Sequence, residues 1–422
     1  MMNRRTVLKG LVAGGLGLPA LSSSLTWFVR TGQAQSISPA RTLVVVFLRG
    51  GCDGLNVCVP YGDPAYYDLR PTIAIAPPDP ADLASALDLD GFFGLHPGLG
   101  AIKRFYDDGR LALFPAVHYP QPSRSHFDSQ HFIESGARRK DLEGWLNRHL
   151  ASTSRPERMR AVGFGKSLPQ SLRGSVVVSS IDNLASFRVP GNQSERDNLL
   201  AALQTVYREQ PSDRPHRAAM REVGEQLIGD LDAVAGIDAD RYPPDNGAVY
   251  PTRSFGRHLQ QTAQLIKAGL GLEIATVDLG GWDTHEGQGG GQVGSRHRHM
   301  LERLASGLNA FATDLGDRMD DVLVIVCTEF GRTVRENGSR GTDHGMASTW
   351  LALGGQVDGG QIYGSWPTLE TGNLVAGRFL PYTIDYRDIF ATVAAGFLGN
   401  SDIDYLFPEY AFSPTKFLRH ES

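Results

Sequence analysis

Five short runs of apolar residues constrain the fold of this chain more than any other feature. The run at 42–48 is rich in β-branched residues and ends at Arg49-Gly50-Gly51. Similar runs recur at 111–117, 175–179, 273–279 and 321–327. A short apolar run that ends at a turn is typical of a strand buried on both faces, as in a parallel sheet.

Amphipathic segments lie between several of these runs, at 96–108, 127–137, 254–269 and 294–315. Strands that alternate with helices predict a parallel sheet covered on both faces. The expected fold class is therefore α/β, a three-layer α/β/α sandwich around a mostly parallel sheet. The polar, helical pattern of 194–235 predicts an inserted hairpin or cap. We expect one domain over 41–415, with a helical insertion around 194–250.

The first residues predict export. Arg4-Arg5, then Leu8 and Lys9, precede an uncharged apolar stretch at 11–25, which is the layout of a twin-arginine signal. That stretch is too short and too glycine-rich for a membrane span of about 20 strongly apolar residues. Small residues at 32–34 place cleavage near Ala34, and an uncleaved anchor is the alternative. The twin-arginine translocase is then the partner during export, the mature protein is periplasmic or secreted, and no stable span remains after cleavage.

Charge and cysteine content exclude some classes of function. Residues 1–34 hold four basic residues and no acid, so their removal takes the formal net charge from -5 to -9. An acidic chain argues against nucleic acid and anionic membranes as partners. The three cysteines, Cys52, Cys58 and Cys327, are too few for a disulfide framework. Buried free thiols are expected, with a Cys52–Cys58 bond as the alternative.

Carboxylates and histidines gather where the predicted strands end, which is where open parallel sheets bind ligands. The candidate metal ligands are Asp53, Asp283, His285, Glu329, Asp343 and His344. Each alone is more typical of a turn, a helix cap or a structural pair. Together they would repel one another unless protons, arginines or cations intervene, and carboxylate with imidazole is the ligand set of zinc, manganese or similar ions. The sequence thus predicts divalent metal ions, and two such ions can clamp a phosphoryl or sulfuryl group.

Ser125 begins a predicted helix and suits a nucleophile, because helix amides favour an anion there. Arg124 or Arg332 is the candidate to hold the oxygens of the transferred group bidentately. The alternative is that Ser125 only caps the helix.

Five motifs carry a family resemblance. They are Arg-Gly-Gly-Cys-Asp-Gly-Leu-Asn at 49–56, Ser-His-Phe at 125–127, Gly-Trp-Asp-Thr-His at 281–285, Thr-Glu-Phe-Gly-Arg-Thr at 328–333 and Gly-Thr-Asp-His-Gly at 341–345. With the twin-arginine leader, they resemble the domain-of-unknown-function (DUF) family 1501 over nearly the whole chain.

That family is similar to the alkaline phosphatase and sulfatase superfamily, and the resemblance implies an alkaline phosphatase-like sandwich with two metals at the rim. By position, Asp53 would be the first-strand metal ligand, and Ser125 the nucleophile with Ser123 as the nearby alternative. Residues 283 and 285, and residues 343 and 344, would supply the later ligand pairs. Pro120 stands where a sulfatase has its modified residue, so a formylglycine mechanism is not expected.

Two functions remain open at this point. The first is an exported metal-dependent hydrolase of phosphate or sulfate esters, acting on a small-molecule or polymer substrate. The second is a non-catalytic exported binding or assembly protein that keeps the hydrolase fold.

Overall fold

The computed structural model describes residues 35–36, 41–120, 122–138, 142–155, 159–189, 191–208, 215–235, 237 and 242–419. The predicted twin-arginine signal and its cleavage site at 1–34 lie outside these residues. Across the described part of the chain, no helix has both the length and the apolar character that a membrane span requires.

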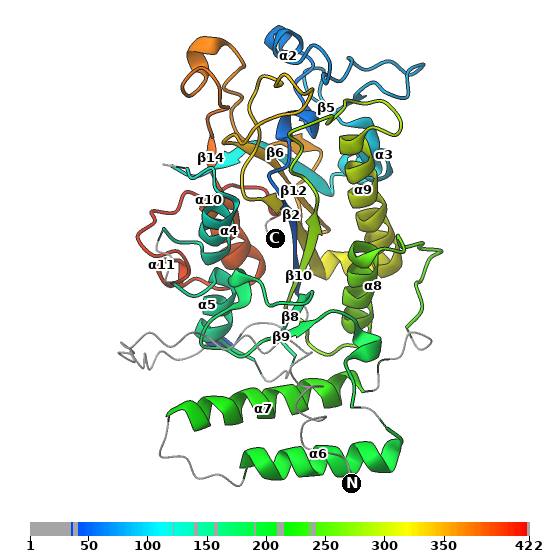
Figure 1. Cartoon of the computed structure of the whole chain (residues 1–422), viewed down its shortest axis with the longest axis vertical. Helices are drawn as coiled ribbons and strands as arrows, with labels where there is room; N and C mark the ends of the chain where they lie inside the picture. Colours follow the sequence, from blue (N-terminus) through cyan, green and yellow to red (C-terminus); the bar gives the residue numbers. More distant parts are fainter. Residues whose placement is uncertain are drawn as a thin grey trace.

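A nine-stranded sheet forms the centre of the molecule (Figure 1). Its order is β13-β6-β12-β11-β2-β10-β8-β9, and β14 pairs with β6. The strands are β2 (Thr42–Arg49), β6 (Leu111–His118), β8 (Ala161–Phe164), β9 (Ser179–Ile181), β10 (Ile274–Gly280), β11 (Val322–Thr328), β12 (Ser348–Gly354), β13 (Gln361–Ile362) and β14 (Ile384–Asp385). Only β12 runs antiparallel to its neighbours in this sheet. The predicted mostly parallel sheet is confirmed.

The apolar runs form strands because both faces of the sheet are covered. In β2, Val44 and Val46 belong to one hydrophobic core, while Leu43 and Val45 belong to the other. Alternate residues of a strand point to opposite faces, so a continuous apolar run is what a doubly covered strand requires. The three-layer prediction is therefore confirmed as well.

Helices cover each face of the sheet (Figure 1). The first core includes side chains from α3 (Gly100–Asp107), α8 (Ser254–Lys267) and α9 (Arg296–Leu315). The second includes side chains from α4 (His126–Ser135), α5 (Trp145–Ser152), α10 (Tyr386–Thr392) and α11 (Ile403–Leu406). Of these helices, α3, α4, α8 and α9 match the amphipathic segments predicted at 96–108, 127–137, 254–269 and 294–315 to within a few residues at each end.

Two longer helices, α6 (Gln193–Arg208) and α7 (Pro215–Val234), pack side by side as a hairpin at one end of the molecule. The remaining elements are short. They are β1 (Gln35–Ser36), β3 (Cys58–Val59), β4 (Leu87–Asp88), β5 (Gly94–Leu95), β7 (Thr153–Ser154), α2 (Pro64–Leu69), the 3₁₀ turns Gly54–Asn56, Pro97–Leu99, Gln170–Leu172, Leu184–Ser186, Gly316–Asp321 and Thr371–Asn373, and a π turn Val393–Phe397.

One predicted strand is largely wrong. Residues 175–178 have no strand structure, and β9 begins only at the last predicted residue, Ser179. The three cysteines are buried and free, so the expected free thiols are confirmed.

Candidate functional site

Three strands of the sheet end side by side and bring their following loops together. Arg49 at the end of β2 lies opposite Gly280 of β10, and Leu48 lies opposite Thr328 of β11. The loops that follow carry the candidate ligands, as expected for the carboxyl edge of a parallel sheet.

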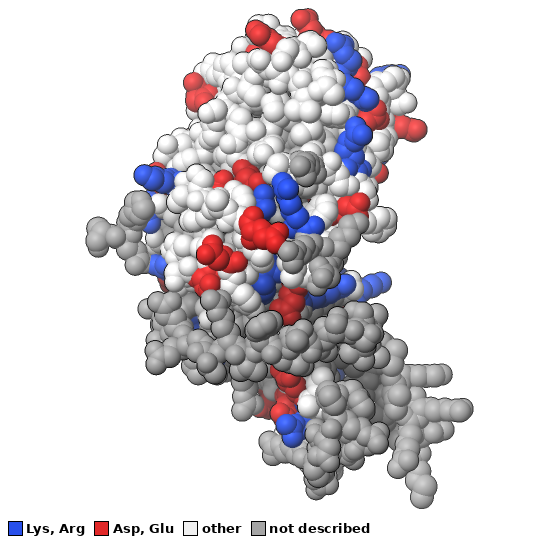
Figure 2. All heavy atoms as spheres, turned by 90° about the vertical axis from the view of Figure 1, so that its left-hand side faces the viewer, with Lys and Arg blue, Asp and Glu red and all other residues white. Residues whose placement is uncertain are grey.

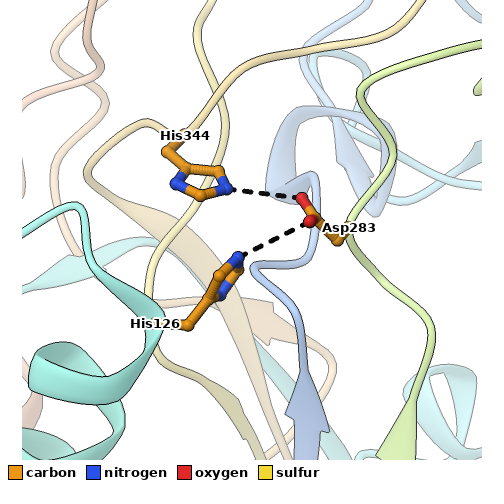
Figure 3. Close-up of side chains that lie close together, drawn as sticks. All are labelled: His126, Asp283 and His344. Carbon is orange, nitrogen blue, oxygen red and sulfur yellow. Dashed lines mark hydrogen bonds and ion pairs between the residues drawn. The ribbon is translucent and has the colours of Figure 1, made fainter.

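His126, Asp283 and His344 converge at this edge (Figure 3). One ligand atom from each lies within 4.8 Å of those of the other two. His344 Nε2 is 3.3 Å from Asp283 Oδ1, and His126 Nε2 is 3.7 Å from Asp283 Oδ2. His126 is the first residue of α4, Asp283 follows β10, and His344 lies in the segment that precedes β12.

His285 borders the same cluster. Its Nε2 lies 3.1 Å from Asp283 Oδ1 and 3.1 Å from His344 Nε2. Three imidazoles thus surround one carboxylate. Their side chains are between 24% and 43% exposed, so the cluster is open to a ligand from solvent.

Each of these histidines uses its other ring nitrogen to contact an outer partner. His126 Nδ1 lies 2.8 Å from Glu329 Oε1, and His285 Nδ1 lies 3.2 Å from Asp343 Oδ1. His344 Nδ1 is 2.9 Å from the backbone oxygen of Arg124. A carboxylate or carbonyl on Nδ1 fixes the tautomer that leaves Nε2 as an acceptor, which is the arrangement of histidines that ligate metals.

The spacing of the cluster fits a metal ion. In a tetrahedral zinc site with ligand distances of about 2.1 Å, neighbouring ligand atoms are about 3.4 Å apart. The nitrogen–oxygen and nitrogen–nitrogen separations here run from 3.1 to 3.7 Å. His126 Nε2 is buried and has no hydrogen-bond partner among the described residues, so it lacks the interaction that an ion would supply.

The electrostatic surroundings keep the carboxylates ionised. Burial works to raise the pKa of Asp283, but the hydrogen bond and charge of Arg332 lower it below its ordinary value. Burial works in the same direction on Glu329, and hydrogen bonds from His126 and Gln130 lower its pKa. The bond to Glu329 raises the pKa of His126, whereas burial lowers that of His344.

Glu329 and Asp343 lie behind the histidines. Glu329 also accepts hydrogen bonds from Gln130 Nε2 and from the backbone nitrogen of Gly50. Asp343 Oδ1 accepts a bond from Asn337, and this bond lowers the pKa of Asp343. Both carboxylates, which the sequence suggested as direct ligands, orient imidazoles in this structure.

Asp53 lies apart from the cluster. Its two oxygens are 2.5 and 2.9 Å from the guanidinium of Arg70, and Gln288 donates a further bond to it. Asp53 and Arg70 are both buried, and although burial works to raise the pKa of Asp53, the charge of Arg70 lowers it. Three of the about four acceptor positions of this carboxylate are thus filled by donors of the protein, and both of its oxygens face Arg70.

Arg332 is also engaged within the protein. Its guanidinium donates to Asp283 Oδ1 at 2.7 Å and to the backbone oxygens of Gly50, Gly51, Trp282 and Thr342. Nε and Nη1 each make one of these bonds and Nη2 makes three, so four of the five N–H groups of the guanidinium are engaged. Arg332 therefore positions Asp283 and ties four loop segments together.

The predicted nucleophile caps a helix. Ser125 is the N-cap of α4, and its hydroxyl accepts a long hydrogen bond, 3.5 Å, from the backbone nitrogen of Asp128. Ser123 Oγ accepts a bond from the backbone of Ser125 and lies 3.3 Å from Asp128 Oδ2. Within the described part of the chain, neither hydroxyl is hydrogen-bonded to the histidine cluster.

His126 is the cluster residue that sequence reasoning missed. It stands in the Ser-His-Phe motif that was selected for Ser125, so the signal was present but was attributed to the neighbouring hydroxyl. An open hollow of about 770 Å³ has Thr72, Glu286 and Arg340 among its lining residues.

The fold and the site define an α/β protein with a histidine–aspartate cluster at the carboxyl edge of its sheet. The chain belongs to the family described as "Protein of unknown function (DUF1501)", whose family model matches residues 40–404. The predicted membership is thereby confirmed. None of the curated proteins compared with this chain matched it.

Solved structures with a related arrangement include hydrolases. The PsFucS1 sulfatase from Pseudoalteromonas sp. is 11% identical, with 86% of this chain and 68% of that one covered and a TM-score of 0.35. The phosphonate monoester hydrolase SpPMH from Silicibacter pomeroyi is 10% identical, with 88% of this chain and 77% of that one covered and a TM-score of 0.32. The alkaline phosphatase from the Antarctic bacterium TAB5 is 7% identical, with 76% of this chain and 92% of that one covered and a TM-score of 0.29. At these TM-scores the likeness bears on neither substrate nor reaction.

Proposed function

We propose that this chain is an exported, metal-dependent hydrolase of phosphate or sulfate esters. One observation carries the proposal. Histidines 126, 285 and 344 each turn Nε2 toward Asp283 while Nδ1 contacts an outer carboxylate or carbonyl. A structural histidine pair has no need of this shared orientation, whereas an ion bound between the Nε2 atoms does.

The ligands proposed are His126, Asp283 and His344, with His285 completing the set, and zinc or manganese is the ion that suits them. When bound, such an ion supplies Lewis-acid charge for the negative charge that develops on the ester oxygens. Arg332 holds one oxygen of Asp283, which leaves Oδ2 facing His126. Ser125 stays the proposed nucleophile, because it adjoins His126 and is only partly buried.

Export rests on the sequence pattern at Arg4-Arg5 and the apolar stretch that follows. Fractionation of cells that express the full chain tests it. A chain with both arginines changed to lysine should stay in the cytoplasm, and export of that variant would contradict the twin-arginine route.

Metal content tests the cluster. Protein purified without chelator, and then reloaded, should hold about one equivalent of zinc or manganese by elemental analysis. His344→Ala and Asp283→Asn should lose the ion. His299→Ala, which removes an exposed histidine on α9, should keep it. Absence of bound metal from the reloaded wild-type protein would overturn the proposal.

Hydrolysis of aryl phosphates and aryl sulfates then separates the enzyme from the non-catalytic alternative. That alternative has one observation in its favour, since in the part of the chain that the structure describes neither Ser125 nor Ser123 is hydrogen-bonded to the cluster. Turnover by metal-loaded protein that disappears in His344→Ala supports the hydrolase. A metal-loaded protein that turns over no mono- or diester is the exported binding or assembly protein.

A further inference from the structure

Two exposed guanidiniums lie against one aromatic ring beside the histidine cluster. Arg124 Cζ is 5.1 Å from the centre of the Phe379 ring, and Arg378 Cζ is 5.5 Å from it. The ring is buried, with 7% of the residue exposed, whereas the Arg378 side chain is 60% exposed. Contact with a ring face holds a guanidinium in place while its N–H groups stay free for other partners.

Both arginines are linked to a cluster histidine, Arg124 directly and Arg378 through Asp343. The backbone oxygen of Arg124 lies 2.9 Å from His344 Nδ1. Arg378 Nη2 lies 3.8 Å from Asp343 Oδ2, and the other oxygen of Asp343 is 3.2 Å from His285 Nδ1. The pair therefore stands at the rim of the cluster although 254 positions separate the two residues in the chain.

The N–H groups of this pair are available, unlike those of Arg332. Among the described residues, no carboxylate lies within ion-pair distance of the Arg124 guanidinium, and the contact of Arg378 with Asp343 is long at 3.8 Å. Arg332 donates to four backbone oxygens and to Asp283. The sequence offered Arg124 or Arg332 as the anion binder, and the structure favours Arg124, with Arg378 as a second candidate beside it.

Guanidiniums near the cluster outnumber the carboxylates that contact its histidines. Four guanidiniums lie close to it, and three carboxylates contact its histidines. The guanidiniums are those of Arg124, Arg296, Arg332 and Arg378, and the carboxylates are Asp283, Asp343 and Glu329. A divalent ion would increase the excess. Such a site attracts a dianion more strongly than a monoanion of the same size.

We infer that Arg124 and Arg378 bind the charged group of the substrate as a pair, and that this group is a dianion, as in a phosphate monoester. This inference rests on the proposed function. A guanidinium binds two oxygens of a tetrahedral phosphoryl group through parallel N–H bonds, and two guanidiniums match its two charges. Sulfate monoesters, which carry a single charge, are the poorer ligands.

Phenylphosphonate and benzenesulfonate test this inference, because they share size and tetrahedral geometry and differ in charge. We expect metal-loaded protein at pH 8.5 to bind phenylphosphonate about ten-fold more tightly than benzenesulfonate, as measured by titration calorimetry. Arg124→Ala and Arg378→Ala should each weaken phenylphosphonate binding about ten-fold and bring the two affinities closer. Arg378→Lys should fall between, because lysine keeps the charge but loses the planar fork.

Arg110→Ala is the matched control. It removes one partly exposed arginine at the opposite end of β6, where Arg110 pairs with Asp320. It should bind both probes as the wild type does. Metal content and melting temperature of every variant are measured in parallel. Unchanged phenylphosphonate affinity in both alanine variants, with metal bound, overturns the arginine pair but leaves the hydrolase proposal standing. Absence of metal from the reloaded wild-type protein contradicts the hydrolase proposal instead.

Discussion

Histidine and carboxylate side chains cluster at both ends of β10, and the two clusters are built differently. At the amino end, His149 and Glu273 are fully buried, and both ring nitrogens of His149 have partners inside the protein. Nε2 lies 2.8 Å from Glu273 Oε1, and Nδ1 lies 3.0 Å from Asn400. Arg160 and Arg155 lie 2.7 and 3.5 Å from the same carboxylate. Burial works to raise the pKa of Glu273, but these partners lower it.

At the carboxyl end, the histidines are partly exposed and only one ring nitrogen of each is used by an outer partner. The difference teaches that residue type alone does not mark a ligand site. What marks it is a set of acceptor atoms that face one another, lack donors of their own and are reachable from solvent. Figure 2 shows the face of helices α4, α5, α10 and α11, on which acidic and basic side chains lie close together rather than in separate large patches.

The largest effect is expected at the closed cluster. Glu273→Ala leaves three cationic or titratable partners buried without a carboxylate, so we expect the free energy of unfolding to fall by about 3–5 kcal/mol. Urea unfolding followed by tryptophan fluorescence measures this change. Asp320→Ala, which breaks an exposed pair with Arg110, should cost less than about 1 kcal/mol. Equal losses in the two variants would show that the amino-end cluster is no more structural than a surface pair.

A third carboxylate sharpens the comparison, because it is buried with only neutral partners. Asp230 on α7 contacts the hydroxyl of Ser179 and the amide of Gln226, and burial raises its pKa from 3.8 to about 6. Among the described residues no cation pairs with it. Its pKa is higher in the folded chain, so the stability it contributes is full below pH 3.8 and is lost as pH rises through about 6.

Asp230→Asn removes this titration. Two pKa units correspond to about 3 kcal/mol, which is the upper bound of the effect. The variant should therefore gain stability relative to the wild type between pH 4 and pH 7.5, measured by urea unfolding at both values. Asp232→Asn, an exposed carboxylate on the same helix, should show no such gain. If the difference in the free energy of unfolding between Asp230→Asn and the wild type is the same at both pH values, the buried charge of Asp230 is ruled out as its cause.

The smallest effect is expected at an outer partner of the open cluster. Glu329→Gln keeps the shape that contacts His126 Nδ1 but removes the negative charge. Metal affinity should fall by about 10- to 100-fold, or about 1.4–2.7 kcal/mol, measured by competition with a chromophoric chelator. Glu134→Gln is the control. It removes a charge from α4, the helix that begins at His126, without touching a cluster histidine, and it should keep wild-type metal affinity. Wild-type affinity in Glu329→Gln would falsify the orienting role.

Much of the fold could be predicted because burial leaves a pattern in the sequence. The apolar runs at 42–48, 111–117, 273–279 and 321–327 become β2, β6, β10 and β11 almost residue for residue. The direction of a strand leaves no such pattern. β12 is apolar and fully buried, yet nothing in its periodicity indicates that it runs antiparallel to its neighbours. Strand order likewise depends on long-range contacts.

The candidate site residues also fall into two groups, those that the sequence predicts and those whose role depends on partners far away in the chain. Asp283, His285 and His344 follow from the rule that loops after parallel strands carry ligands, and the structure brings them together. Asp53 and Arg332 satisfy the same rule, but their partners are invisible in the sequence. Arg70 lies 17 residues from Asp53, and the backbone oxygens that Arg332 binds belong to loops far from it in the chain. Side chains that serve the fold and side chains that serve a ligand share one edge of the sheet.

The proposed ligands come from the start of α4 at position 126 and from loops at positions 283 and 344, which only the finished sheet aligns. The binding site therefore does not exist in the unfolded chain, and the ion would enter after folding and add its binding energy to the stability of the whole domain. Under the proposed twin-arginine export, in which the chain crosses the membrane already folded, this order has a further consequence. The metal would be chosen by the compartment in which the chain is made and folds, and not by the one in which it works.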